Sequence, residues 1–417
     1  MREMKDSGVE WIGEIPCDWK LERSQWHLEE VNISNNPIQT NNVLSLTNKL
    51  GVVPYEEKGN QGNKSKENVY EYKLAYPNTI VANSMNILIG SVGLCDYFGC
   101  VSPVYYVFRA KKYNNIKFLN YVFQTVGFQR ELRKYANGIL EIRLRVSSSD
   151  ILKRFIPFPS EVEQQRIAEF LDRECGKIDG LKADIQAQID TLEQYKRSVI
   201  TEAVTHGLNP SAPMKDSGIP WVGQFPTHWT KKKGKYILRY MSKPVKQDDG
   251  VITCFRDGEV TLRSNRREDG FTMADKEIGY QGVDVGDLVV HGMDGFAGAI
   301  GISDSRGKAS PVLNVLNTKQ KKKYIMYYLR SMAYGEVFTA LSTGIRVRSC
   351  DLRWNKLAEL LYPLPPIDEQ NNIVNYIDEQ IARTNEIIAD KKSQIETLDG
   401  YKKSLIYEYV TGKKEAV

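Results

Sequence analysis

The sequence lacks the patterns that would build a metal site, a disulfide framework or a membrane segment. Its six cysteines and four histidines are dispersed over 417 residues, with no CxxC pair and no HExxH motif. No window approaches eighteen consecutive apolar residues, and the first residues lack the apolar core of a signal peptide. We therefore predict no metal, no cofactor and a cytoplasmic location.

A strong excess of one charge is also missing. Lys and Arg number 57 and Asp and Glu number 52, which gives a formal net charge of +5. A histone-like or polybasic protein would have a much larger excess of basic residues, so this net charge permits nucleic acid as a partner without requiring it. With 41% hydrophobic residues the chain is long enough for a proper core, and its length suggests two or three domains.

The chain contains the same unit twice. Met4–Lys20 matches Met214–Thr230 at an offset of 210, with 9 of 17 positions identical. A second ungapped match joins residues 157–205 to residues 363–411 at an offset of 206. Such a repeat decides the whole architecture. Each copy has a signature segment, a variable body and a long conserved segment.

The long conserved segments are typical of helices. Each follows a proline-rich breaker and then runs about forty residues without proline. Apolar positions recur three and four residues apart in one heptad frame, as in a coiled-coil seam. The predicted seam residues are Leu171, Ile178, Ile185, Ile189, Leu192, Val199, Ile377, Ile381, Ile388, Ile395, Leu398 and Leu405. Lysines also occupy the seam, among them Lys182 and Lys391, either fixing the register or as tolerated imperfections.

We predict that the two helices pair antiparallel, which would relate the halves of the chain by an approximate two-fold axis. The alternative is that each helix packs only on its own domain. The variable bodies mix strand-like runs, such as 79–82, 104–108 and 287–290, with short helical stretches at 116–123 and 324–329. The fold class is therefore α+β, with mixed α/β domains at 1–160 and 208–366 and helices at 161–207 and 367–412.

Positive charge gathers inside the variable bodies. One such run is more often a solvated face than a binding site, but arginine pairs recur at corresponding places in both halves. Lys and Arg neutralise phosphates, and alternating arginines on a strand present two guanidinium groups on one face. The candidate DNA-binding residues are Arg143, Arg145, Arg346, Arg348, Lys231, Lys232, Lys233, Arg263, Arg266 and Arg267.

The sequence offers no catalytic constellation. It has no NPPY-like motif, and the stretch from Gly301 to Lys308 has P-loop spacing that is one residue too long. Glu163 and Glu369 resemble paired catalytic carboxylates, but both fall in the first turn of a predicted helix, where acidic residues favour the helix dipole. The duplicated tryptophans of the signature segments, including Trp19 and Trp229, are predicted to anchor those segments by packing.

These motifs resemble those of the specificity subunit of Type I restriction-modification enzymes. The resemblance rests on the D-S-G-x-x-W-x-G-x-x-P-x-x-W signature (Asp6–Trp19 and Asp216–Trp229) and on the P-x-P-P-x-x-E-Q helix start, found intact at Pro363–Gln370. The Y-K-[KR]-S-[VL]-I helix ending (Tyr195–Ile200 and Tyr401–Ile406) completes it. The first copy departs from the helix-start pattern at residues 160–162, which puts only the edge of that helix in doubt.

The resemblance implies two target-recognition domains, each reading one half of a split, asymmetric sequence in double-stranded DNA, with the helices as a ruler. It also implies docking of two methyltransferase (modification) subunits and two motor-nuclease (restriction) subunits, which would supply the methyl-donor and ATP chemistry. The chain itself would be a non-catalytic subunit. Two other functions stay open at this stage: a self-contained DNA nuclease or methyltransferase, and a protein-only coiled-coil scaffold.

Overall fold

The computed structural model describes residues 2–47, 51–58, 68–111, 114–138, 144–266, 277–341 and 352–416. The chain divides into two compact units. Unit 1 comprises Met1–Ile185 with Lys392–Val417, and unit 2 comprises Gln186–Lys391. Each unit holds one signature segment, one variable body and a stretch of both long helices.

The body of unit 1 is built on a four-stranded antiparallel sheet in the order β4-β11-β8-β9. These strands are β4 (Leu28–Glu30), β11 (Tyr105–Ala110), β8 (Thr79–Asn83) and β9 (Val92–Cys95). Two-stranded sheets pair β1 (Met4–Asp6) with β2 (Glu14–Pro16), β3 (Lys20–Arg23) with β12 (Phe155–Phe158), β5 (Leu44–Thr47) with β6 (Gly51–Pro54), and β7 (Lys73–Ala75) with β10 (Gly99–Val101). The short helices are α1 (Ile116–Gln124), α2 (Val126–Arg133) and α3 (Ser148–Leu152), with 3-10 turns η1 (Ser24–Trp26), η2 (Tyr55–Lys58) and η3 (Ile87–Ile89).

Unit 2 repeats this topology, with a four-stranded sheet in the order β16-β23-β20-β21. These strands are β16 (Leu238–Tyr240), β23 (Leu313–Thr318), β20 (Leu288–His291) and β21 (Ile300–Ile302). The pairs are β13 (Met214–Asp216) with β14 (Gln224–Pro226), β15 (Thr230–Lys233) with β24 (Leu361–Leu364), β17 (Ile252–Cys254) with β18 (Val260–Leu262), and β19 (Gln281–Val283) with β22 (Gly307–Ala309). Its helices are α5 (Arg263–Arg266), α6 (Lys322–Tyr334), α7 (Val337–Ala340) and α8 (Trp354–Glu359), with η5 (Gly234–Tyr236) and η6 (Gly295–Ala297).

The predicted α+β class is therefore confirmed. The strand-like run at 79–82 lies in β8, and those at 104–108 and 287–290 fall in β11 and β20 apart from their first residues. The pairing register is duplicated as well. Leu44 faces Pro54 in the first hairpin and Ile252 faces Leu262 in the second, at a constant offset of 208. Because a one-residue slip would move every side chain to the other face, the shared register makes positions in the two bodies directly comparable.

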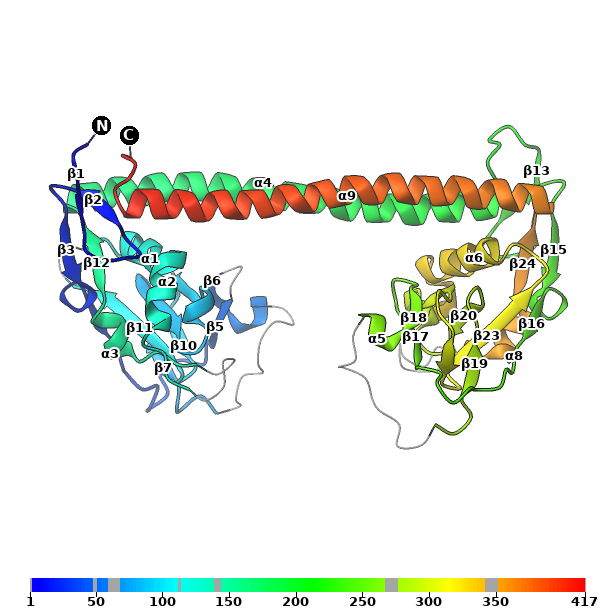
Figure 1. Cartoon of the computed structure of the whole chain (residues 1–417), viewed down its shortest axis with the longest axis horizontal. Coiled ribbons are helices and arrows are strands. Elements are labelled where there is room, and N and C mark those ends of the chain that lie inside the picture. The colour runs from blue at the N-terminus through cyan, green and yellow to red at the C-terminus, as the bar shows by residue number, and fades with distance from the viewer. Residues whose placement is uncertain are drawn as a thin grey trace. The chain divides into compact units, whose positions relative to one another are not determined.

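The long helices are α4 (Glu161–His206, 46 residues) and α9 (Ile367–Val410, 44 residues). In unit 1, Lys402 Nζ lies 2.6 Å from the carboxylate of Asp179, and Lys182 pairs with Asp399. Residue numbers rise along α4 as they fall along α9, so the helices run antiparallel and form the predicted coiled coil (Figure 1).

Unit 2 holds the same antiparallel pairing. Lys196 Nζ donates to Asn385 Oδ1 at 2.9 Å, and Lys391 donates to Gln188. Each of the four seam lysines of the two units thus reaches a polar group on the opposite helix.

The structure places all twelve predicted seam residues at buried or half-buried positions. The buried ones are Leu171, Ile178, Ile189, Val199, Ile377, Ile388 and Leu405. The half-buried ones are Ile185, Leu192, Ile381, Ile395 and Leu398. The start of α4 also packs on its own body, because Ile167 and Leu171 share one core cluster with Phe118 of α1. Packing on the domain and pairing with the other long helix therefore occur together. Among the described helices, none combines the length and the apolar character needed to cross a membrane.

Candidate nucleic-acid interface

The first turn of each long helix anchors the signature segment of its unit. Trp19 Nε1 donates to Glu163 Oε2 at 2.8 Å, and Trp229 Nε1 donates to Glu369 Oε1 at 3.0 Å. Both indole rings are buried. The carboxylates were expected to favour the helix dipole; the structure adds a hydrogen bond to the tryptophans, which are the expected anchors. A charge-assisted hydrogen bond at this point fixes where the chain enters each body.

A second duplicated contact holds each body on its long helix. In unit 1, Asp172 of α4 accepts from Tyr121 Oη at 2.7 Å and pairs with Lys117 at 2.6 Å. Burial and the neighbouring carboxylate raise the pKa of Tyr121, so its hydroxyl keeps the donated proton. The corresponding residues of unit 2 are Lys323, Tyr327 and Asp378. Each body is therefore held at two points near the start of its long helix.

Unit 2 carries a cleft of about 650 Å³ between β17, α5 and the end of β20. We name it the arginine cleft, because three guanidinium groups converge there. Its lining residues are Ile252, Thr253, Cys254, Phe255, Arg256, Asp257, Arg263, Arg266, His291, Asp294, Ser310 and Leu313.

Carboxylates orient two of the arginines in this cleft. Arg266 Nη1 lies 2.7 Å from Asp257 and 2.9 Å from Glu259, and its guanidinium carbon lies 4.2 Å from the centroid of the Phe255 ring. Arg256 Nη2 lies 3.0 Å from Asp294 Oδ1. A guanidinium has five N–H donors in a rigid fork, so these pairs set its plane and leave other N–H groups for a ligand.

His291 adds a neutral donor to the arginine cleft. Its Nδ1 accepts the backbone N–H groups of Met293, at 3.2 Å, and Asp294, at 2.9 Å. Burial lowers the pKa of His291 below its usual value, so the ring is neutral near pH 7. Because Nδ1 is an acceptor, the proton lies on Nε2, and His291 offers one N–H donor.

Unit 1 places different side chains on the same frame. At the offset of 208, Tyr55 takes the place of Arg263, Lys58 that of Arg266, and Asn83 that of His291. The same contact from side chain to backbone occurs in both units. Asn83 Oδ1 accepts the Met85 N–H at 3.0 Å, and His291 Nδ1 accepts the Met293 N–H. The two bodies therefore hold unlike hydrogen-bonding groups at equivalent positions.

Of the ten candidate DNA-binding residues, the structure brings Arg263 and Arg266 together in the arginine cleft. Arg145 of unit 1 is exposed, and its backbone pairs with that of Asn137. Arg143, Arg267, Arg346 and Arg348 lie outside the described residues.

The three lysines of β15 do not line the arginine cleft. Lys231 donates to the Ser217 carbonyl, Lys233 pairs with Glu359 at 2.7 Å, and Lys232 is exposed.

Sequence reasoning missed Arg256 and His291. The repeat could have pointed to them. Once the register of the hairpins gives the offset of 208, each residue of unit 2 can be compared with its equivalent in unit 1. Among the described residues, no group of three His, Cys, Asp or Glu side chains is placed to hold a metal ion.

The chain is similar to known DNA-specificity proteins. Residues 27–191 match the family described as the Type I restriction modification DNA specificity domain. Over 323 residues the chain is 19% identical to the StySPI specificity subunit of a Type I restriction enzyme from Salmonella potsdam, a match that covers 74% of this chain and 67% of that protein.

One solved structure shares the fold, and a second aligns with a lower TM-score. A chain from a study of complex assembly and conformational transition in the type I R-M system aligns with a TM-score of 0.67 at 12% identity, covering 96% of this chain and 99% of that one. The HsdS subunit from Thermoanaerobacter tengcongensis aligns at a TM-score of 0.48 and 13% identity, covering 96% of this chain and 98% of that one. Residues 27–191 therefore match a Type I restriction modification DNA specificity domain, and the chain is similar to Type I restriction-modification specificity subunits.

Proposed function

We propose that this chain sets the DNA sequence specificity of a Type I restriction-modification complex, with each body reading one half of a split, asymmetric target. The observation that carries the proposal is the duplicated frame with unlike side chains at equivalent positions. Arg263 and His291 in unit 2 correspond to Tyr55 and Asn83 in unit 1. Two domains with the same backbone but different hydrogen-bond donors and acceptors can recognise different base sequences.

The chemistry of the arginine cleft favours base edges over bare phosphate. Two of its three guanidinium groups, those of Arg256 and Arg266, are already partnered by carboxylates, which would repel a phosphate but orient the N–H forks. Arg reads guanine O6 and N7 through two parallel hydrogen bonds, and Asn reads adenine in the same manner. Phosphate contacts from other basic side chains would position the duplex without specifying its sequence.

The long helices are proposed to set the spacing between the half-sites and to dock the other subunits. The 46 residues of α4 span about 69 Å at 1.5 Å per residue. This is about twice the length of one DNA turn, roughly 34 Å. Two methyltransferase subunits and two motor-nuclease subunits would join the chain in the cytoplasm and supply the catalysis, so that the chain itself needs no cofactor.

Mapping methylated positions in host DNA, with and without this chain, tests the proposal. We expect one bipartite motif that disappears when the chain is deleted. Duplex binding by the purified chain with its methyltransferase should weaken as salt rises. A methylation pattern that is unchanged on deletion, or the absence of DNA affinity at low salt, would refute the proposal. Cleavage or methyl transfer by the chain alone would instead identify a self-contained enzyme.

A further inference from the structure

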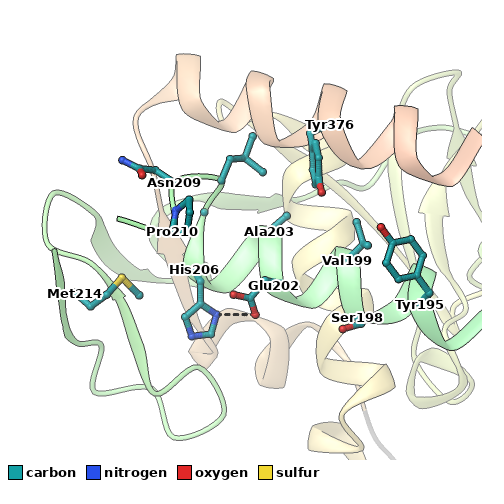
Figure 2. A pocket seen from close by; sticks show the side chains of 12 residues that line it. Tyr195, Ser198, Val199, Glu202, Ala203, His206, Asn209, Pro210, Met214 and Tyr376 are labelled. Atoms are coloured by element: carbon teal, nitrogen blue, oxygen red, sulfur yellow. Dashed lines mark ion pairs between the residues drawn. The ribbon is translucent and has the colours of Figure 1, made fainter. Parts of the chain in front are cut away.

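A second cavity of unit 2, of about 830 Å³, adjoins the arginine cleft, because Arg256 and Asp257 line both. We name it the basic cavity, since four of its lining residues carry positive charge: Lys196, Arg197, Arg256 and Arg330. Figure 2 shows another cavity of the same unit, beside the end of α4, and none of the residues that line it is Lys or Arg. Charge and position thus connect the basic cavity with the arginine cleft.

Within the basic cavity, Arg330 of α6 contacts the backbone that carries the arginine cleft. Its Nη2 donates to the carbonyl oxygen of Asp257. The guanidinium also covers Gly258, whose φ is +89°, and a Cβ atom on that residue would meet it. The Nε of Arg330 is buried, with no hydrogen-bond partner among the described residues. These contacts hold the guanidinium between α6 and the turn at residues 257–258.

The turn that Arg330 contacts carries two side chains of the arginine cleft. It comprises residues 255–259 between β17 and β18, and its first residue donates a backbone hydrogen bond of 2.8 Å to the carbonyl oxygen of its last. Arg256 lies on this turn, and the carboxylate of Asp257 lies 2.7 Å from Arg266 Nη1. The carbonyl group that Arg330 binds therefore belongs to the residue that follows Arg256 and orients Arg266.

Helix α6 is itself fixed on the long helix α9. The hydroxyl of Tyr327 donates to Asp378 of α9, and Lys323 pairs with the same carboxylate at 2.7 Å. Arg330 follows Tyr327 by three residues, and residues at this spacing are neighbours on a helix surface. Arg330 therefore joins a helix whose position is set by α9 to the turn of the arginine cleft.

Unit 1 has a different residue at the equivalent position. Asp172 in unit 1 and Asp378 in unit 2 hold α1 and α6 at a shared offset of 206, at which Gln124 takes the place of Arg330. A glutamine side chain is shorter than arginine and carries no charge. We therefore expect the loss of Arg330 to alter reading by unit 2 alone.

We propose that Arg330 is a positioning residue for sequence recognition by unit 2. It contacts no base: it holds the turn at 255–259 so that the guanidinium groups of Arg256 and Arg266 are presented to the base edges. The inference rests on the proposed function, in which the arginine cleft reads bases. Loss of Arg330 then lowers discrimination between base pairs and leaves the phosphate contacts, which do not depend on sequence, in place.

Arg330→Met tests this role, because it keeps an unbranched stem and removes the donors. The full-length chain is titrated by fluorescence anisotropy with duplexes built on its methylation motif, varied one base pair at a time, and with an unrelated duplex. We expect discrimination to fall about fivefold or more at the base pairs where R256A or R266A also lose it, with affinity for the unrelated duplex unchanged. The matched control is Arg383→Met, which removes an exposed arginine of α9 paired with Glu379 and should bind like the wild type.

A chain without the two cleft arginines separates positioning from direct contact. In the R256A/R266A background, R330M should change affinity by less than about twofold, because nothing remains for Arg330 to position. A larger loss in that background, or an equal loss for every duplex, would mean a direct phosphate contact and overturn the inference. Wild-type discrimination by R330M would overturn it as well.

Two further variants keep the test decisive if R330M does not fold. Arg330→Lys keeps one donor for the Asp257 carbonyl and should retain part of the discrimination, whereas Gly258→Ala pushes against the guanidinium and should lose it at the same base pairs. Wild-type discrimination by G258A would overturn the inference. Failure of the wild type to discriminate between duplexes would refute the proposed function, whereas wild-type discrimination by R256A and R266A would refute only the cleft and this inference.

Discussion

Replacing Arg256 in the arginine cleft distinguishes reading of a base from contact with a phosphate. Arg256→Ala removes the guanidinium, and Arg256→Lys keeps the charge but loses the fork. The exposed ion pair with Asp294, 3.0 Å long, contributes only about 0–1 kcal/mol to folding, so both variants should fold. A bidentate contact with a base contributes about 1–3 kcal/mol of discrimination, which is about 5- to 150-fold in affinity.

The assay is fluorescence anisotropy at fixed salt, with duplexes in which each base pair of the target is varied in turn. We expect Arg256→Lys and Arg256→Ala to lose affinity alike, and the loss to fall on one base position of one half-site. The control is Lys233→Ala, whose lysine pairs with Glu359 away from the arginine cleft. Full retention of affinity by the Lys variant would mean a phosphate contact, and no loss in either variant would refute the assignment of the cleft.

Two further predictions concern the stability of unit 2. Hydrogen bonds from Lys243 and then Arg306 lower the pKa of Asp284 to about 2, below its ordinary value of 3.8. The stabilisation is therefore complete above about pH 4 and is lost as the pH falls from there toward 2. Protection factors of unit 2 amides, which correct for the intrinsic exchange rate, should fall over this window, and an equal fall in a K243M variant would contradict the cause. Trp229→Phe removes the hydrogen bond to Glu369 and should destabilise unit 2 by about 1.5–3 kcal/mol, measured by hydrogen exchange of its amides. Unchanged protection would contradict the anchoring role.

The long helices could be predicted from the sequence because their signals are local and periodic. Proline-free length, heptad spacing and the repeat at 206 define α4, α9 and their antiparallel pairing. The seam lysines were ambiguous, since nothing in the heptad pattern shows that Lys402 meets Asp179 across the helices. That contact depends on the register of two segments more than two hundred residues apart.

The arginine cleft was only partly predictable. In the sequence, Arg263 and Lys233 are equally good candidates for DNA binding, because each lies in a run of basic residues. Only the tertiary structure shows that Arg263 lines the arginine cleft and that Lys233 lies in β15, the strand paired with β24. Arg256 and His291 meet there because a hairpin and a sheet strand converge, a long-range arrangement that composition does not encode. The bodies diverge between the repeats, so their equivalence appears only through the shared strand register.

The most direct test of the central claim, two readers spaced by paired helices, is a matched insertion of one heptad in both long helices. Placed after Ile185 and after Lys391, the insertions preserve the seam pattern and lengthen the helix pair by about 10 Å. Methylation mapping in a host that carries this variant should find both half-sites unchanged and the spacer between them longer by about three base pairs, at roughly 3.4 Å each. An unchanged spacer, or altered bases within a half-site, would contradict the account.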